Sequence, residues 1–349
     1  MISFLSLMLA AAPPQDVTVG SATAAPGKTG YGQLAIPAGS DSALNIPVAV
    51  IRGTRPGKTV AFVAGSHGTE YASIVAMQRL IPRIDAAKLA GTVIVVPLIN
   101  VASIEQMVPH TNPIDRKSLN GNYPGDPNGT QSQRALYAIT KSVVDPADVV
   151  VDLHGGDLDE DLRPYSYWFR GGNAAQDDAG KALALAFGLD HIIVTNVNPA
   201  SPNAGRSLSG QSLVKGKTVL VAEAGRSGLV LDADVNALVD GSLNVLGALG
   251  MLDRRVTPLS NPVWLNGAGA RVTADSGGMW FQAVMRDARV KKGDVLGRTT
   301  DYLGRPVAEI RSPMDGVVTF IRGVPSTWRG ATLANVAPVF TTVLPWTAP

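Results

Sequence analysis

Short apolar runs recur from about residue 45 onward, and small or polar residues flank most of them. Runs of this length that are rich in Val and Ile are typical of buried β-strands. We expect strands over residues 46–51, 59–64, 92–98, 148–153, 192–194 and 218–222. Helical spacing of apolar positions predicts helices over residues 71–81, 131–144 and 230–252. Strands that alternate with helices predict an α/β fold, with a mixed, largely parallel sheet and helices on both faces.

The pattern changes near Pro258, where short alternating stretches punctuated by glycine replace the longer runs. Such a texture predicts a small all-β domain. We therefore expect an α/β domain over residues 16–257 and an all-β domain over 258–349, with a linker between Pro258 and Pro262.

The N-terminus reads MISFLSLMLAAA, a short apolar stretch that ends in small residues. It resembles a secretory signal, although no Lys or Arg precedes the apolar run, and it is too short to span a membrane. We expect a signal peptide over residues 1–15 and a periplasmic or secreted protein. The alternatives are a buried N-terminal strand or a mis-assigned start, and the protein is cytoplasmic if the segment is not cleaved.

Composition narrows the class of partner. The 349 residues are 45% hydrophobic, which is enough for one large core or two smaller ones. A net charge of +2 with only 17% charged residues leaves no basic stripe, so no nucleic-acid partner is expected. The absence of cysteine excludes disulfides and thiolate metal sites. Homo-oligomerisation is left open.

Two of the four histidines, His67 and His154, each follow a predicted strand, and Glu70 lies three residues after His67. Two imidazoles and one carboxylate are the ligand set of a catalytic zinc that keeps an open position for water. We expect these residues to bind one Zn²⁺ per chain. The alternative is that His67 caps a turn and His154 satisfies a buried polar contact. Asp152 lies two residues before His154, where it either points across the other face of the strand or holds an imidazole.

A zinc-bound water also requires a group that accepts its proton. Glu223 follows the strand-like run 218–222, and burial there would raise its pKa toward the working range. Its alternative role is a loop carboxylate paired with Arg226. The polar, turn-rich segment 111–125 is expected to be a binding loop, or else a plain surface excursion.

Four segments together resemble the succinylglutamate desuccinylase/aspartoacylase family, a branch of the zinc carboxypeptidase-like (M14-type) fold. They are GSHGTE (65–70), NPIDRKSLNGNYPG (112–125), DLHGG (152–156) and EAG (223–225), and the resemblance covers residues 45–255 and is greatest to the bacterial predicted-deacylase branch. It implies zinc ligands at His67, Glu70 and His154, a catalytic carboxylate at Glu223 and a substrate contact at Asn120.

The chain departs from the family's loop pattern at two positions. Gly121 and His110 stand where the family has arginines that grip a substrate carboxylate and polarise the scissile carbonyl. Neither residue is equivalent to a bidentate guanidinium. We expect His110 to assist catalysis and Arg116, in the same loop, to bind substrate; a solvated loop charge is the alternative for Arg116. Other candidates for the substitute are Arg134, Arg163, Arg206 and Arg226.

The C-terminal segment resembles a lipoyl-type barrel-sandwich domain, in which Met314-Asp315-Gly316 occupies the hairpin that carries a modifiable lysine in carrier domains. Without a lysine there, covalent lipoyl or biotin attachment is not expected. We expect this domain to shape the entrance of the active site or to mediate oligomer contacts.

These inferences predict an enzyme, a zinc-dependent hydrolase that cleaves the amide bond of small N-acyl amino acids or related amides. Glu223 takes a proton from the zinc-bound water and returns it to the leaving amine. An M14-type carboxypeptidase acting on peptides is the nearest alternative. A non-catalytic zinc or ligand-binding protein that has lost the substrate arginines is another.

Overall fold

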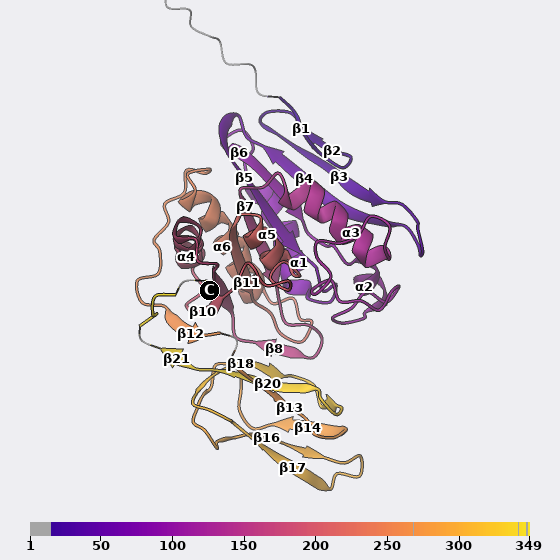
Figure 1. The fold of residues 1–349 in the computed structure, drawn as a ribbon, viewed down its shortest axis with the longest axis vertical. Helices are drawn as coiled ribbons and strands as arrows, with labels where there is room; N and C mark the ends of the chain where they lie inside the picture. Colours follow the sequence, from indigo (N-terminus) through magenta and orange to yellow (C-terminus); the bar gives the residue numbers. More distant parts are fainter. Residues whose placement is uncertain (1–14, 268, 341, 347) are drawn as a thin grey trace, which may run out of the picture.

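The computed structural model describes residues 15–349 except 268, 341 and 347, and its largest element is a ten-stranded mixed sheet (Figure 1). Across the sheet, the order is β21 (Val339–Phe340), β12 (Val263–Asn266), β10 (His191–Asn196), β9 (Tyr165–Arg170), β11 (Thr218–Glu223), β7 (Val149–His154), β5 (Arg55–Ala64), β6 (Ala90–Val96), β4 (Leu44–Arg52) and β3 (Lys28–Ile36). The predicted signal peptide falls outside the described residues, apart from residue 15.

Parallel pairing is confined to two blocks, β11–β7–β5–β6 and β9–β10–β12. The β9–β11 pair is antiparallel, as are the outer strands β3, β4 and β21 to their neighbours. Antiparallel neighbours can be joined directly by a loop, as β3 and β4 are through residues 37–43, whereas parallel ones need a crossover. The prediction of a mixed α/β sheet is confirmed, and its parallel part is smaller than the apolar pattern suggested.

Each strand expected from the apolar runs is present, as β4, β5, β6, β7, β10 and β11. The predicted helices are α1 (Tyr71–Leu80), α3 (Gln131–Ile139) and α6 (Asp232–Ala248), and a π-helical turn (Thr140–Val144) follows α3. The periodicity did not reveal β3, β9, the 3-10 turn Ile81–Arg83, or the helices α2 (Val101–Gln106), α4 (Ala174–Phe187) and α5 (Leu208–Val214). None of the helices in the described part of the chain is both long and apolar enough to span a membrane.

Helices cover both faces of the sheet, as predicted. Val60 and Phe62 of β5 are buried with α1, α4 and α6, while the alternate residues Ala61 and Val63 are buried with α3. Successive side chains of a strand point to opposite faces, so a strand covered on both sides is apolar throughout. This explains why the central strands read as unbroken apolar runs.

The C-terminal part is all-β and consists of two small sheets. One contains β13 (Ala270–Thr273), β20 (Thr332–Ala337), β18 (Gly316–Arg322) and β15 (Arg289–Val290), with β8 (Glu160–Leu162) on β18; the other contains β17 (Pro306–Arg311), β16 (Val295–Thr300), β14 (Gly278–Gln282) and β19 (Ser326–Thr327). A separate hairpin joins β1 (Val17–Val19) and β2 (Ala22–Ala24). Sheet pairing crosses the boundary expected at residue 257 in both directions, because β12 and β21 extend the large sheet and β8 joins the small one.

Candidate active site

Strand register places three polar side chains in one row across the sheet. His154 and Glu223 are the last residues of β7 and β11, and they lie opposite each other in the parallel pairing. Tyr165 of β9 lies opposite Glu223 on its other side. Directly opposed residues on neighbouring strands point to the same face. A histidine, a carboxylate and a phenol therefore meet at the carboxyl ends of β7 and β11, as the sequence predicted for the first two.

The turn after β5 brings His67 and Glu70 to the same edge. Gly65 has a φ of 66°, and a Cβ there would lie 2.8 Å from the Cα of Leu98, so only glycine fits this close approach. Glu70 occupies the N-cap of α1 but makes no side-chain cap hydrogen bond. Its carboxylate turns instead toward the two histidines, which indicates that its position serves the site rather than the helix.

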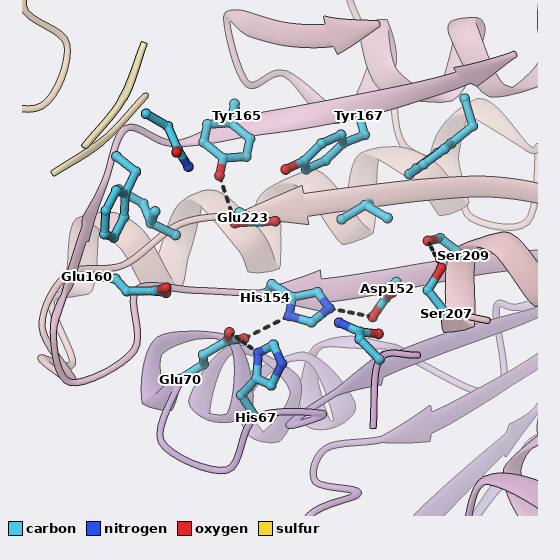
Figure 2. A pocket seen from close by; sticks show the side chains of 16 residues that line it. His67, Glu70, Asp152, His154, Glu160, Tyr165, Tyr167, Ser207, Ser209 and Glu223 are labelled. Carbon is cyan, nitrogen blue, oxygen red and sulfur yellow. Dashed lines mark hydrogen bonds and ion pairs between the residues drawn. The ribbon is translucent and has the colours of Figure 1, made fainter. Parts of the chain in front are cut away.

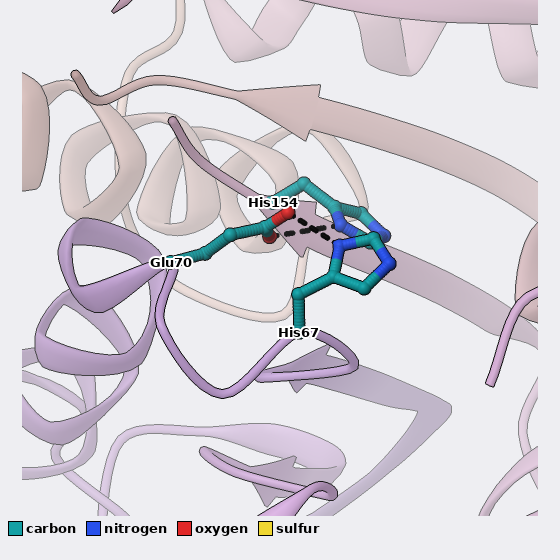
Figure 3. A group of neighbouring side chains, drawn as sticks. All are labelled: His67, Glu70 and His154. Atoms are coloured by element: carbon teal, nitrogen blue, oxygen red, sulfur yellow. Dashed lines mark hydrogen bonds and ion pairs between the residues drawn. The ribbon is translucent and has the colours of Figure 1, made fainter. Parts of the chain in front are cut away.

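His67, Glu70 and His154 converge closely (Figure 3). The Nδ1 of His67 lies 2.5 Å from Oε1 of Glu70, and the Nδ1 of His154 lies 2.9 Å from Oε2. One donor atom from each of the three residues lies within 4.8 Å of the others. Asp152 Oδ1 is 3.1 Å from Nε2 of His154, so a carboxylate faces the far ring nitrogen and leaves Nδ1 to face a metal ion. The donor set and its outer carboxylate fit a zinc ion.

The charges in this group are strongly coupled. Burial alone would raise the pKa of Glu70, but the adjacent His154 and His67 imidazoles hold that pKa well below its usual range. Burial opposes protonation of both histidines, yet the charge of Glu70 raises the pKa of His67 and of His154. Glu70 is therefore ionised at neutral pH, as a metal ligand must be.

The environment of Glu223 differs from that of Glu70, although both residues lie at the same edge of the sheet. Burial raises the pKa of its carboxyl to about 7, and the charge of Glu70 adds to this rise while that of His154 opposes it. The hydroxyl of Tyr165 donates a 2.9 Å hydrogen bond to Oε2 of Glu223. A carboxyl group that titrates near neutral pH is suited to proton transfer.

These groups line a single pocket of about 280 Å³, a size that suits a small molecule (Figure 2). The lining residues are His67, Glu70, Asn120, Asp152, His154, Glu160, Leu162, Tyr165, Tyr167, Phe169, Ser207, Ser209, Val221, Glu223, Phe320 and Asn335. Phe320 and Asn335 come from β18 and β20, so the C-terminal part contributes residues to the pocket wall. A role of this part in shaping the active site was one of the two expectations drawn from the sequence.

Several lining residues were missed by sequence reasoning. Tyr165, Tyr167 and Phe169 alternate along β9, and this period-2 aromatic pattern is the signal that could have revealed them. Glu160 and Asn335 lie in stretches with no distinctive pattern, and only the fold brings them to the pocket.

His110 lies beside the metal-ligand group, with its ring centroid 6.0 Å from that of His67. Its Nδ1 is 3.1 Å from Asp157, and its Nε2 is 3.1 Å from Asp159. Burial disfavours the imidazolium, but the hydrogen bond that its ring N–H donates to Asp159 and the charges of the surrounding carboxylates outweigh burial and raise the pKa of His110. With both ring nitrogens facing carboxylates, His110 is a fixed cation at neutral pH rather than a base.

The loop of residues 112–125 is anchored on α3, where the carboxylate of Asp115 accepts hydrogen bonds from the backbone and hydroxyl of Ser132. Asn120, to which the resemblance assigns a substrate contact, lines the pocket. Arg116 is exposed and is not among the lining residues. Gly121 has a φ of 94° with no atom within 4 Å of a Cβ built there, so the space that an arginine would enter is open.

Comparison with known proteins decides the family. A model of the succinylglutamate desuccinylase/aspartoacylase catalytic domain matches residues 56–249, more than half of the chain. The chain belongs to this family. This part of the chain contains His67, Glu70, His154 and Glu223. The resemblance stated from the sequence is thereby confirmed.

Individual relatives cover nearly the whole chain. An N-alpha-acetyl-L-2,4-diaminobutyric acid deacetylase from Halomonas elongata is 29% identical over 88% of this chain and 91% of its own length. The product-bound structure of the ectoine utilization protein EutE (DoeB) from Ruegeria pomeroyi has a TM-score of 0.80 at 25% identity, covering 89% of this chain and 95% of that one. A succinylglutamate desuccinylase/aspartoacylase structure from Rhodobacter sphaeroides has a TM-score of 0.79 at 25% identity, covering 90% and 96%.

Proposed function

We propose that this protein is a zinc-dependent deacylase that hydrolyses the amide bond of small N-acyl amino acids or related amides. The observation that carries the proposal is the placement of Glu223, a carboxyl with a pKa of about 7, in the same row and on the same pocket wall as the metal-ligand group. A protein that only binds metal has no need of a proton acceptor there. The deacetylase relative supports amide hydrolysis as the reaction.

When bound by His67, Glu70 and His154, a zinc ion supplies Lewis-acid polarisation of the amide carbonyl and acidifies a water molecule. Glu223 accepts a proton from the attacking water as the new carbon–oxygen bond forms. It then delivers that proton to the nitrogen as the carbon–nitrogen bond breaks. The hydroxyl of Tyr165 fixes the orientation of the Glu223 carboxylate. We assign the stabilisation of developing negative charge to the His110 imidazolium, whose ring centroid lies 6.0 Å from that of His67.

Metal analysis combined with hydrolysis assays on a panel of N-acyl amino acids tests the proposal. We expect about one zinc ion per chain, reduced in the His67→Ala and His154→Ala variants. The Glu223→Gln variant is expected to keep its zinc and lose turnover. Glu105→Gln, which changes an exposed glutamate, serves as the matched control. Stoichiometric zinc without Glu223-dependent turnover on any substrate would favour a binding protein, and unchanged zinc in both histidine variants would exclude the metal site.

We also propose that the N-terminal apolar segment directs export and is cleaved. Its support is the sequence of residues 1–12, which ends in Ala10-Ala11-Ala12. N-terminal sequencing of the mature protein from its source cells would test this, and recovery of the intact Met1 terminus from the cytoplasm would contradict it.

A further inference from the structure

The pocket is rich in carboxyl groups. Four line it, from Glu70, Asp152, Glu160 and Glu223, whereas no lysine or arginine is found among its described lining residues. Burial raises the pKa of Glu223 to about 7 and that of Glu160 to about 8, so an added cation would favour the ionised form of both. Charges interact more strongly in a partly buried pocket than in water, so these carboxyl groups favour a cationic group on the substrate.

Among the carboxyl groups that line the pocket, Glu160 is the one to which the proposed reaction assigns no role. Its Oε2 accepts a 3.2 Å hydrogen bond from the backbone N–H of Asp157. In the described part of the chain, no lysine or arginine forms an ion pair with it. The His110 imidazolium is close, with a ring nitrogen within 4.8 Å of a carboxyl oxygen of Glu160. That ring, however, already contacts Asp157 and Asp159. Figure 2 shows the Glu160 carboxyl group pointing toward the middle of the pocket.

The same pocket has an aromatic wall on β9. Tyr165, Tyr167 and Phe169 share one face of this strand, with ring centroids 5.5 Å apart for the first pair and 5.7 Å for the second. The electron-rich faces of such rings attract cations and also accept the methylene chain that carries them. An acidic side chain and an aromatic wall in one pocket are suited to an aliphatic ammonium group.

We propose that the substrate amide carries a protonated aliphatic amine, and that Glu160 and the aromatic wall of β9 bind this ammonium group. The inference rests on the proposed function, because it names the substrate class of that same site. It also gives a reason for Gly121 and the carboxylate-bound His110, since a cationic substrate needs no arginine clamp. The ammonium group is carried either by the amine part or by the acyl part of the amide.

Matched amides that differ only in charge test the inference. For the amine part, N-(4-aminobutyl)acetamide is compared with the neutral N-pentylacetamide and the anionic 4-acetamidobutanoate. For the acyl part, 3-amino-N-butylpropanamide is compared with N-butylbutanamide. With the zinc-loaded wild type, we expect kcat/KM for one cationic amide to exceed that of its neutral partner by about tenfold or more, equivalent to one ion pair of moderate strength. The cationic amide should also be a better substrate than the anionic one.

Glu160→Gln is the diagnostic variant, because the amide oxygen of glutamine can keep the hydrogen bond from Asp157. It is expected to bring the cationic-to-neutral ratio close to one. Glu160→Asp is expected to give an intermediate ratio, and the exposed Glu105→Gln should leave the ratio as in the wild type. An unchanged ratio in a folded Glu160→Gln protein, or a preference for the anionic or neutral amides, would overturn the inference.

Binding without turnover separates this inference from the proposed function. Calorimetric titration of the zinc-loaded Glu223→Gln protein with the cationic and neutral amides should show tighter binding of a cationic one. If that preference is found but the wild type hydrolyses no amide, the proposed function fails and the charge selectivity stands. If amides are hydrolysed without any preference for the cationic ones, the substrate class is wrong and the hydrolase stands.

Discussion

Two glutamates that line the same pocket as His67 and His154 have opposite acid–base behaviour. Burial acts on Glu70 and Glu223 alike, but two imidazoles and the backbone N–H of Gly155 contact Glu70, while a neutral phenol contacts Glu223. The pKa of Glu70 is therefore lowered and that of Glu223 is raised to about 7. Carboxyl groups whose environments separate their pKa values in this way can be given different roles, here metal ligand and proton acceptor.

The role of Glu223 predicts a pH dependence. Because the ionised carboxylate is the active form, kcat/KM should fall as pH decreases through the pKa of Glu223, with a midpoint at or below pH 7 once a metal cation is nearby. Glu223→Gln should lower kcat by about 10²- to 10⁴-fold and abolish this acidic limb. Steady-state kinetics from pH 5 to 9 would measure both. If the acidic limb of the pH profile persists in the Glu223→Gln variant, it reports the titration of another group.

We expect a substitution of Asp152 to weaken metal binding rather than to disturb the fold. Its carboxylate faces Nε2 of His154, and removing such an outer partner typically weakens zinc binding by about 10- to 100-fold. Asp152→Asn should therefore release zinc more readily in competition with a chelator of known affinity. Glu223→Gln is the comparison variant, since it leaves the ligand group untouched. Equal zinc affinity in the two variants would mean that Asp152 does not hold the ring.

At the scale of elements, the site depends on how β5 passes into α1. The chain turns within a few residues, and the left-handed conformation of Gly65 against Leu98 makes that turn possible. The N-cap position of Glu70 then fixes where its carboxylate stands relative to His67. The spacing of these two ligands is thus set by a turn and a helix start rather than by a helix face.

Gly65→Ala should destabilise the protein and disturb the metal site together. A left-handed alanine costs about 1 kcal/mol or more, and the close approach to Leu98 adds to it, so we expect a loss of about 2–3 kcal/mol in the free energy of unfolding. Gly216→Ala is the matched control, because its φ is 78° with no atom within 4 Å of an added Cβ. Urea unfolding would compare the two. Equal losses would show that the contact with Leu98 is unimportant.

At the scale of the whole molecule, the C-terminal part completes the pocket. β8 carries Glu160 and pairs with β18 of the small sheet, and Arg322 of β18 lies 2.6 Å from Asp159. Asp159 in turn contacts His110. The segment around Asp159 and Glu160, which contacts His110, is therefore supported from the C-terminal part, whereas the candidate metal ligands His67, Glu70 and His154 all lie in the α/β part.

This arrangement predicts that Arg322→Met affects activity without releasing the metal. Arg322 is buried, and its removal leaves His110 as the one remaining cation beside Asp159 among the described residues, which should cost about 3 kcal/mol of stability. Zinc content should stay at wild-type level while kcat/KM falls. Arg311→Met breaks an exposed ion pair with Glu309 on the same part of the chain and should cost less than about 1 kcal/mol. Loss of zinc in the Arg322 variant would mean that the metal site also depends on this contact.

Much of the molecule was predictable from local pattern. Apolar runs identified the central strands, because those strands are buried on both faces. Polar residues at the ends of three such runs identified His67, Glu70, His154 and Glu223, because the ends of parallel strands meet at one edge of the sheet. The strand β9 was missed because Trp168 stands between the polar residues Ser166 and Arg170, so its two faces do not separate cleanly into apolar and polar positions.

The sequence by itself therefore determined the α/β class, the family and the metal-ligand and proton-acceptor candidates, since each depends on residue type and short-range spacing. Only the tertiary structure decided what surrounds them. Glu160, Asn335 and the tyrosines of β9 reach the pocket through pairing between distant strands, and local spacing carries no information on such pairing. The substrate that the pocket accepts depends on the charge of its lining, and residues far apart in the sequence contribute to that charge.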